Sequence, residues 1–361
     1  MRISIGILAY NESSVIARTI GSALAQSLLV APPEWVEKIE LVCVPNGCTD
    51  DTAAVAKRAI EEGMARLPAA ASGRVTGRVV ELARGGKVNA WNEFMSRISD
   101  QAADRVIMMD GDIRIDHPDT MLNLIKALDE HPEAVVSTPE FIKHVALKRR
   151  KSLLEWLTLL LGATNRARGY GLCGMMYCGR GEFLRRVCFP DGMIGEDAFL
   201  HGLIITDLCR CREERYDRVV GAPDARVVFE AYTSIPKLFK AQRRQAVTRG
   251  VNAILWDYLW NNVGELDAGE LIRRRSAEDP EWFKKLVAER VKEKGWWVMP
   301  KGVLLRRLRS LRNLPLGSAL ATLPWAVVGA VADVVIHVNA NSLLKRGRIQ
   351  GLWQTTQTTK I

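Results

Sequence analysis

The alternation of strand-like and helix-like segments over the first 120 residues is the feature that most restricts the fold of this chain. Short apolar runs typical of strands lie at residues 3–10, 39–45, 78–83 and 105–110. Segments of helical character follow the first three runs, at residues 11–26, 49–67 and 87–98. Such an alternation predicts an α/β fold in which helices flank a mostly parallel sheet. Ligands of such folds bind at the carboxyl ends of the strands.

The composition is that of an ordinary globular protein. The 361 residues are 48% hydrophobic and 25% charged, which allows one large domain or two smaller ones. The seven cysteines include no C-x-x-C pair, and their odd number argues against a secreted disulfide framework. We therefore expect a reduced, cytoplasmic setting. The N-terminal residues 1–10 are predicted to form a strand and not a signal peptide.

The excess of basic residues predicts an anionic partner. The net charge is +10, and arginine and lysine gather in several clusters along the chain. The clusters occupy residues 143–151, 240–245, 271–275 and 304–312. No helix-turn-helix, zinc-finger or aromatic RNA-binding signature accompanies them, so nucleic acid is not the expected partner. A phospholipid surface or a phosphorylated small molecule fits the pattern better.

The chain is predicted to have three regions, namely an α/β domain over residues 1–236, a helical extension over 237–300 and a C-terminal segment over 301–361. The C-terminal segment begins with leucines and arginines on opposite faces of a predicted helix at 303–312, as in helices that lie on anionic membranes. Residues 313–332 follow without a charge and are barely long enough to span a bilayer. Two prolines and Asp333 weaken the case for a span. A span, an interfacial or re-entrant segment, and a helix packed on the protein's own core all stay open.

Two carboxylates end the fourth apolar run, in the sequence Asp110–Gly111–Asp112. Side chains of like charge this close together need a counter-charge. Carboxylate oxygens bind Mg²⁺ or Mn²⁺, and such a cation would also neutralise a diphosphate. A solvated turn is the simpler alternative for this motif taken alone.

Three further segments can be assembled around such a cation. Lys87 begins a predicted helix, where backbone N–H groups and a cation favour a phosphate. Asn46 follows the second apolar run, where its amide could hydrogen-bond a nucleobase edge. Glu196 and Asp197 are adjacent acids at a helix start, where they could also simply cap the helix. Each could be an ordinary turn or cap, but together they predict a pocket for a metal-bound nucleotide diphosphate with carboxylates to spare.

These motifs, in this order, resemble those of the family 2 inverting glycosyltransferases, which have the GT-A fold. The resemblance covers about residues 1–250. The opening strand and the loop Ala9–Tyr10–Asn11–Glu12 are similar to the family's first motif, and residues 44–52 resemble the loop that holds the donor base. Residues 85–92 resemble the G-K-x-x-A-L-N segment, and 109–112 carry the D-x-D motif. Residues 171–200 follow the family's glycine-rich acceptor loop and its E-D pair.

The resemblance implies a role for each motif. Asp110 and Asp112 would bind Mg²⁺ or Mn²⁺ and the donor diphosphate. Asp197 would act as the general base that deprotonates the acceptor hydroxyl, and Glu196 would hold Asp197 or the acceptor. The implied donor-binding residues are Ala9, Tyr10, Asn11, Glu12, Asn46, Lys87, Asp110, Gly111, Asp112, Gln242 and Arg243.

Two departures from the family pattern affect the predicted substrates. Pro45 and Asn46 stand where the family usually has an aspartate that contacts the donor base. Asparagine can still donate and accept hydrogen bonds, and a uridine nucleotide stays the expected donor. The Q-x-x-R-W motif of processive synthases keeps Gln242, but Gln245 and Ala246 replace its arginine and tryptophan. Transfer of a single sugar is therefore favoured over processive synthesis.

The sequence thus predicts a metal-dependent inverting glycosyltransferase. It would move one sugar from a nucleotide-sugar donor, expected to be a UDP-sugar, to a lipid-linked or saccharide acceptor. The expected place is the cytoplasmic side of the inner membrane, as a peripheral or single-span protein. The alternatives are a nucleotidyltransferase and a non-catalytic protein that binds nucleotides or lipid headgroups.

Overall fold

The predicted alternation of strands and helices is confirmed in the computed structural model of the protein. The structure describes residues 1–152, 155–156, 159, 171–232, 234–300, 302–313 and 316–347. The strands are β1 (Arg2–Ala9), β2 (Lys38–Pro45), β3 (Val75–Val79), β4 (Arg105–Asp110), β5 (Arg114–Ile115), β6 (Val136–Lys143), β7 (Met176–Arg180) and β8 (Val219–Phe229). The helices beside them are α1 (Ile16–Leu24), α2 (Ser27–Val30), α3 (Thr52–Ala65), α4 (Lys87–Glu93), α5 (Thr120–Glu130), α7 (Gly181–Arg186) and α8 (Glu196–Ile205).

The strands form one sheet in the order β3-β2-β1-β4-β7-β6-β8-β5. The first four strands of that order are parallel, as predicted. Strand β7 pairs antiparallel with both β4 and β6, while β6 and β8 are parallel and β5 and β8 antiparallel. The sheet of the described chain is therefore mixed but mostly parallel, and its antiparallel pairings all involve β5 or β7.

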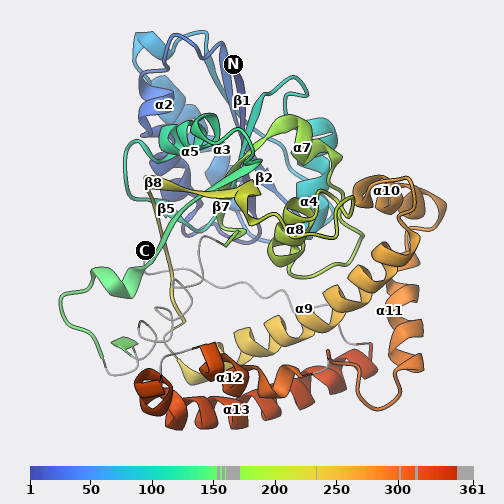
Figure 1. Ribbon diagram of the computed structural model, residues 1–361. Coiled ribbons are helices and arrows are strands. Elements are labelled where there is room, and N and C mark those ends of the chain that lie inside the picture. Colours follow the sequence, from blue (N-terminus) through green and yellow to red (C-terminus); the bar gives the residue numbers. More distant parts are fainter. Residues whose placement is uncertain are drawn as a thin grey trace.

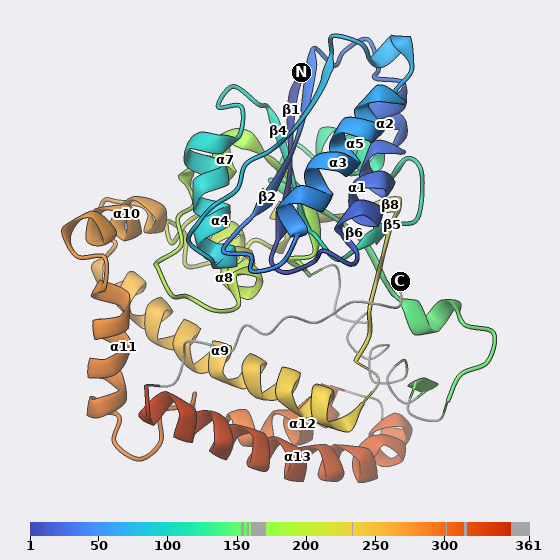
Figure 2. The same cartoon turned by 180° about the vertical axis from the view of Figure 1, so that it is seen from behind.

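Helices cover both faces of the sheet (Figures 1 and 2). One face packs on α1, α3 and α5, through side chains such as Ile20, Ile60 and Leu124. The other face packs on α4, α7 and α8, through Trp91, Phe183 and Phe199. Because both faces are buried, functional side chains are left to the edges where the strands end.

Most of the C-terminal helices lie beyond the carboxyl ends of β1, β2 and β4, whereas the helix over residues 268–278 lies beside the sheet domain (Figures 1 and 2). The C-terminal helices are α9 (Ile235–Asn262), α10 (Ala268–Glu278), α11 (Trp282–Glu293), α12 (Arg306–Ser310) and α13 (Leu316–Lys345). Helices α9 and α13 run alongside each other, and a Cβ atom on Gly250 would come within 2.8 Å of Leu344 Cδ1. The division into regions 1–236, 237–300 and 301–361 stays a prediction.

The C-terminal segment differs from its prediction in two ways. The expected helix at 303–312 is broken into α12 between two 3-10 turns, Val303–Leu305 and Leu311–Asn313. The apolar segment was expected over residues 313–332. The helix that contains it, α13, continues past Asp333 to Lys345. Within α13, Thr322–Lys345 is long and apolar enough to cross a membrane, by length and composition alone. Residues 348–361 of the predicted membrane segment lie outside the described residues.

Candidate active site

The predicted metal-binding motif lies at the carboxyl edge of the sheet, where β4 ends beside β1. Asp110 is the last residue of β4, and Gly111 N–H donates to the carbonyl of Leu8 at 2.8 Å. A Cβ atom on Gly111 would lie 2.9 Å from Ala9 Cβ, so a larger residue would push the two strand ends apart. The glycine between the aspartates therefore lets the motif pack closely against the end of β1.

Lys87 joins this edge to the E-D pair. It is the first residue of α4, and its Nζ lies 2.6 Å from Asp110 Oδ1 and 3.0 Å from Glu196 Oε1. The same Nζ donates to the carbonyl of Gly174 at 3.1 Å. Only 15% of the Lys87 side chain is exposed. One buried ammonium group thus holds together motifs that are 86 residues apart in the sequence, between Asp110 and Glu196.

The two catalytic candidates open helix α8 after a sharp turn. Gly195 has a left-handed φ of 71°, and its backbone lies against α9, since a Cβ atom there would meet Thr248 Cγ2 at 2.1 Å. Glu196 is buried. Asp197 Oδ1 accepts a hydrogen bond from the N–H of Ala198 at 2.8 Å. Both acids line one hollow together with Lys87, Asp110 and other side chains.

Burial and neighbouring charges shift the pKa values of these groups. Burial raises the pKa of Asp110 to about 7, although the ion pair with Lys87 opposes the shift. Burial lowers the pKa of Lys87, but Asp110 and Glu196 outweigh it and raise the pKa well above its ordinary value. Burial and the charge of Glu196 raise the pKa of Asp197, while Lys87 and Arg244 lower it. A carboxylate whose pKa is raised is a stronger base, which suits the role predicted for Asp197.

Glu12 adds a third acid near the two aspartates. It is buried in the loop after β1, and its N–H donates to Thr52 Oγ1 at 2.8 Å. Its Oε2 atom has no hydrogen-bond partner among the described residues. Burial and the charges of Asp112, Asp110 and Asp50 raise the pKa of Glu12 to about 9. Carboxyl oxygens of several acids therefore gather at this edge of the sheet.

These oxygen donors fit a divalent cation. Mg²⁺ and Mn²⁺ prefer carboxylate oxygens, and the aspartates of the D-x-D motif supply them. No group of three or more His, Cys, Asp or Glu side chains in the described part of the chain is arranged to hold an ion alone. Mg²⁺ is usually bound by one or two carboxylates together with the substrate's phosphates.

The other predicted donor-binding residues are distributed unevenly around this edge. Tyr10 is 39% exposed, and Asn11, with a left-handed φ of 55°, accepts a hydrogen bond from Thr49 N–H at 2.8 Å. The amide of Asn46 is engaged within the protein, since it donates to Ala9 O at 2.8 Å and accepts from Gly86 N–H at 2.9 Å. Asn46 therefore ties the ends of β1 and β2 to α4, and its expected contact with a nucleobase stays a prediction.

Gln242 and Arg243 lie on α9, and no contact with Glu196 or Asp197 is seen for them in the described part of the chain. Arg243 is half-buried, and its Nε has no partner in the described part of the chain. The next residue, Arg244, is the one whose charge acts on Asp197. Sequence motifs did not distinguish these neighbouring arginines, because which of them faces the site depends on how α9 packs on Gly195.

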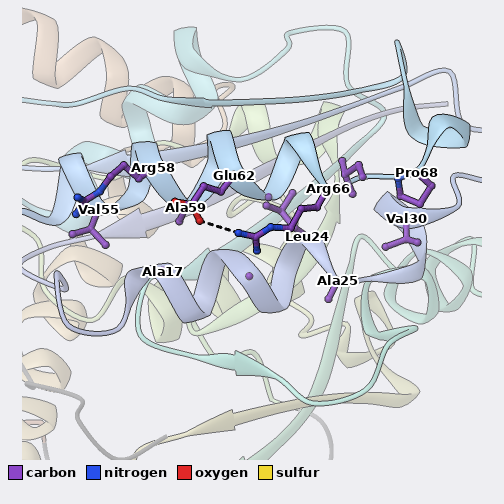
Figure 3. A pocket seen from close by; sticks show the side chains of 13 residues that line it. Ala17, Leu24, Ala25, Val30, Val55, Arg58, Ala59, Glu62, Arg66 and Pro68 are labelled. Atoms are coloured by element: carbon purple, nitrogen blue, oxygen red, sulfur yellow. Dashed lines mark hydrogen bonds and ion pairs between the residues drawn. The ribbon is translucent and has the colours of Figure 1, made fainter.

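A second hollow lies away from this site, between α1 and α3 (Figure 3). Its volume is about 540 Å³, and small side chains such as Ala17 and Ala59 line much of it. An ion pair of 2.9 Å between Arg66 and Glu62 crosses its wall. It contains none of the predicted site residues.

Comparison with known proteins agrees with the resemblance seen in the motifs. The model of the glycosyl transferase family 2 matches residues 4–187, just over half of the chain, and the chain belongs to this family. A comparison with curated protein sequences gave no match.

Solved structures with the same fold include glycosyltransferases. Mannosyltransferase PcManGT from Pyrobaculum calidifontis, in complex with GDP-Man and Mn²⁺, is 17% identical, with a TM-score of 0.51 over 97% of this chain and 87% of that one. Glucosyl-3-phosphoglycerate synthase from Mycobacterium tuberculosis is 20% identical, with a TM-score of 0.43 over 69% of this chain and 77% of that one. The family match and the likeness to the mannosyltransferase confirm the predicted GT-A fold, and the protein is a glycosyltransferase of family 2.

Proposed function

We propose that this protein is a metal-dependent inverting glycosyltransferase that moves a single sugar from a nucleotide-sugar donor to a hydroxyl acceptor. The observation that carries the proposal is the position of Lys87, which binds Asp110 and Glu196 at once. A donor diphosphate beside Asp110 would therefore have its sugar next to the E-D pair. This is the arrangement that a one-step displacement needs.

The chain's own residues have the following roles in that step. Asp197 takes the proton of the acceptor hydroxyl, whose oxygen forms a bond to the anomeric carbon. The bond between that carbon and the diphosphate oxygen breaks, and the configuration at the carbon inverts. Lys87 stays charged at neutral pH and faces the charge that develops on the leaving diphosphate. A Mg²⁺ or Mn²⁺ ion, when bound by Asp110 and Asp112, would neutralise the same diphosphate.

The donor and acceptor are proposed more broadly. A UDP-sugar remains the expected donor, and a lipid-linked or saccharide acceptor at the cytoplasmic face of a membrane fits the basic, apolar C-terminal region. The engaged amide of Asn46 leaves base recognition to the neighbouring backbone and to other side chains. For this reason the donor nucleotide has to be found by experiment.

The test is nucleotide release from a panel of UDP-, GDP-, ADP- and dTDP-sugars, with Mn²⁺ or Mg²⁺ and then with EDTA. Glycosyltransferases often hydrolyse their own donor slowly, so release is expected from one nucleotide class and should be lost in EDTA. Thermal shifts with the same panel separate binding from turnover. Binding of a nucleotide sugar without release, even with a broad set of acceptors, would support the non-catalytic alternative and contradict the proposal.

A further inference from the structure

Helix α13 has two chemically different faces. Its buried face, which packs on the rest of the protein, consists of Asp333, Ile336, His337, Ala340, Asn341 and Leu344. Its exposed face consists of Leu320, Leu323, Val327, Val328, Val331, Val334, Val335 and Val338, each 41–64% exposed. We call these eight residues the apolar stripe. At 100° per residue the stripe occupies an arc of roughly 140° along the helix.

The apolar stripe stands out from the rest of the protein surface. It contributes eight of the fifteen large apolar side chains that are exposed in the described part of the chain. Monomeric soluble proteins rarely expose a continuous apolar patch of this kind, and larger ones mark interaction surfaces. The stripe therefore has a partner that does not belong to the described chain.

The buried face fixes α13 to the protein through polar contacts. Arg307, from α12, forms an ion pair with Asp333 at 2.9 Å, and its stem crosses Gly329, where a Cβ atom would lie 2.7 Å from Arg307 Cδ. Asn341 accepts from Val298 N–H at 2.7 Å and donates to the carbonyl of Trp296 at 2.8 Å. Breaking these buried contacts to expose this face to lipid would leave charged and polar groups unpaired in hydrocarbon.

The position of α9 argues against a transmembrane orientation of α13. The two helices run alongside each other through much of their length (Figures 1 and 2). Helix α9 carries charged residues at 237, 240, 243, 244, 249 and 257, so it cannot enter the bilayer beside α13. If α13 crossed a membrane, α9 would have to cross with it. Helix α13 is long enough to span a bilayer, but its packing on α9 therefore holds it parallel to a membrane surface.

Charge identifies the partner as an anionic membrane surface. The sole acid in residues 316–347 is Asp333, which is buried and paired, so the outward face of α13 has no negative charge. Exposed basic residues flank its ends, with Arg309 and Arg312 before it and Lys345 and Arg346 at its end. Trp296, which is 79% exposed, is held beside α13 by Asn341. Basic residues and tryptophan are typical of the interface between lipid headgroups and acyl chains.

We propose that α13 lies flat in the interface of a bilayer containing anionic phospholipids, with the apolar stripe in the acyl-chain boundary and the basic ends at the headgroups. A helix in this position is an interfacial segment and not a span. This inference rests on the membrane association proposed above, but not on sugar transfer.

The first test replaces Val328, Val331 and Val335 together by asparagine in the full-length protein. Asparagine and valine have similar helix propensities, and neither carries charge, so folding and electrostatics should change little. Binding to phosphatidylcholine vesicles with about a third phosphatidylglycerol should weaken by at least tenfold. The matched control, with leucine at the same three positions, should bind at least as well as the wild type. The wild type should bind pure phosphatidylcholine vesicles less well, because the basic ends lose their partners.

The second test distinguishes a flat helix from a span. A cysteine is placed at either end of α13, by Ser318→Cys or Lys345→Cys, and sealed inside-out membranes of expressing cells are treated with an impermeant maleimide. Labelling above the background of the native cysteines is expected at both ends. Protection of one end would mean that α13 spans, and would overturn the proposal.

A second copy of the chain is the competing partner for the apolar stripe. If the wild type is a dimer in solution, and the asparagine variant becomes a monomer that still binds vesicles, the stripe is a dimer interface and the proposal is wrong. Donor-nucleotide release by the asparagine variant without membranes should match the wild type. A protein that binds vesicles but releases no nucleotide would overturn the proposed activity and leave this inference intact.

Discussion

Replacing Lys87 by methionine tests the contact that joins the two halves of the candidate active site. The change keeps the apolar stem and removes the ammonium group that pairs with Asp110 and Glu196. Loss of one partner from a buried ion pair costs about 3–5 kcal/mol, because it leaves an unpaired charge. Asp110 is 23% exposed and has a pKa of about 7, so it can take up a proton and reduce the loss. We therefore expect the lower end of that range, about 3 kcal/mol at neutral pH.

The loss of stability in the Lys87→Met variant should grow as the pH rises. Lys87 lowers the pKa of Asp110, so in the methionine variant that pKa lies above 7. Between the two pKa values the wild-type carboxyl is ionised and paired, while the variant's carboxyl is still protonated. By linkage, the stability difference grows as the pH rises through about 7 and shrinks toward pH 5.

The assay is thermal unfolding at pH 5, 6, 7 and 8 in the presence of EDTA, followed by donor-nucleotide release with Mn²⁺. At pH 8 we expect a Tm lower than that of the wild type by roughly 4–6 °C, with a smaller difference at pH 5. The control Lys57→Met removes an exposed ammonium group from α3 and should leave Tm within about 1 °C. A Tm difference for the Lys87 variant that is below 1 °C, or the same at every pH, would refute the reasoning.

Two further predictions concern the side of the site formed by α9. Arg244→Gln removes a charge that lowers the pKa of Asp197, so the acid limb of the kcat/KM profile should move to higher pH, whereas Arg243→Gln should leave it in place; equal shifts in both variants would contradict the assignment. Gly195→Ala should destabilise the protein by about 2–4 kcal/mol. The new methyl group would lie 2.1 Å from Thr248 on α9, and alanine would have to adopt the left-handed φ of this position. Gly192→Ala has the same backbone strain with no atom within 4 Å, so denaturant unfolding should show a loss of only about 1 kcal/mol, and similar losses at both positions would rule out the contact with α9.

The sequence predicted the first half of the fold because its signals are local. Apolar runs such as 105–110 and the helical segments between them read directly as β-α units, and β1 to β4 lie within a few residues of the predicted runs. The antiparallel placement of β7 between β4 and β6 depends on contacts between distant segments, which periodicity does not contain. The mostly parallel sheet was predicted, but for the same reason the antiparallel positions of β5 and β7 were not.

The limits of the C-terminal prediction have a similar cause. Asp333 read as the end of an apolar segment, because an unpaired carboxylate does not belong in one. In the structure Arg307, 26 residues away, neutralises it, so α13 continues past it. Long-range partners of this kind cannot be read from the spacing of residues in one segment.

The sequence predicted which residues form the candidate site, but not which of them contact one another. The motifs identified Asp110, Glu196 and Lys87, and the structure brings all three together. The sequence assigned Lys87 to a phosphate and Asn46 to a nucleobase. Their contacts within the protein depend on how α4 packs against the ends of β2 and β4.

The central claim, that Asp197 is the base of a sugar-transfer reaction, is tested most directly by Asp197→Asn. With the donor found in the nucleotide panel, the variant should bind that donor within about twofold of the wild type while release falls by at least a hundredfold. Asp224→Asn, at a carboxylate that is 67% exposed, is the control and should retain full activity. If the Asp197 variant binds donor and still releases nucleotide at a rate near that of the wild type, Asp197 is not the base and the proposed mechanism is wrong.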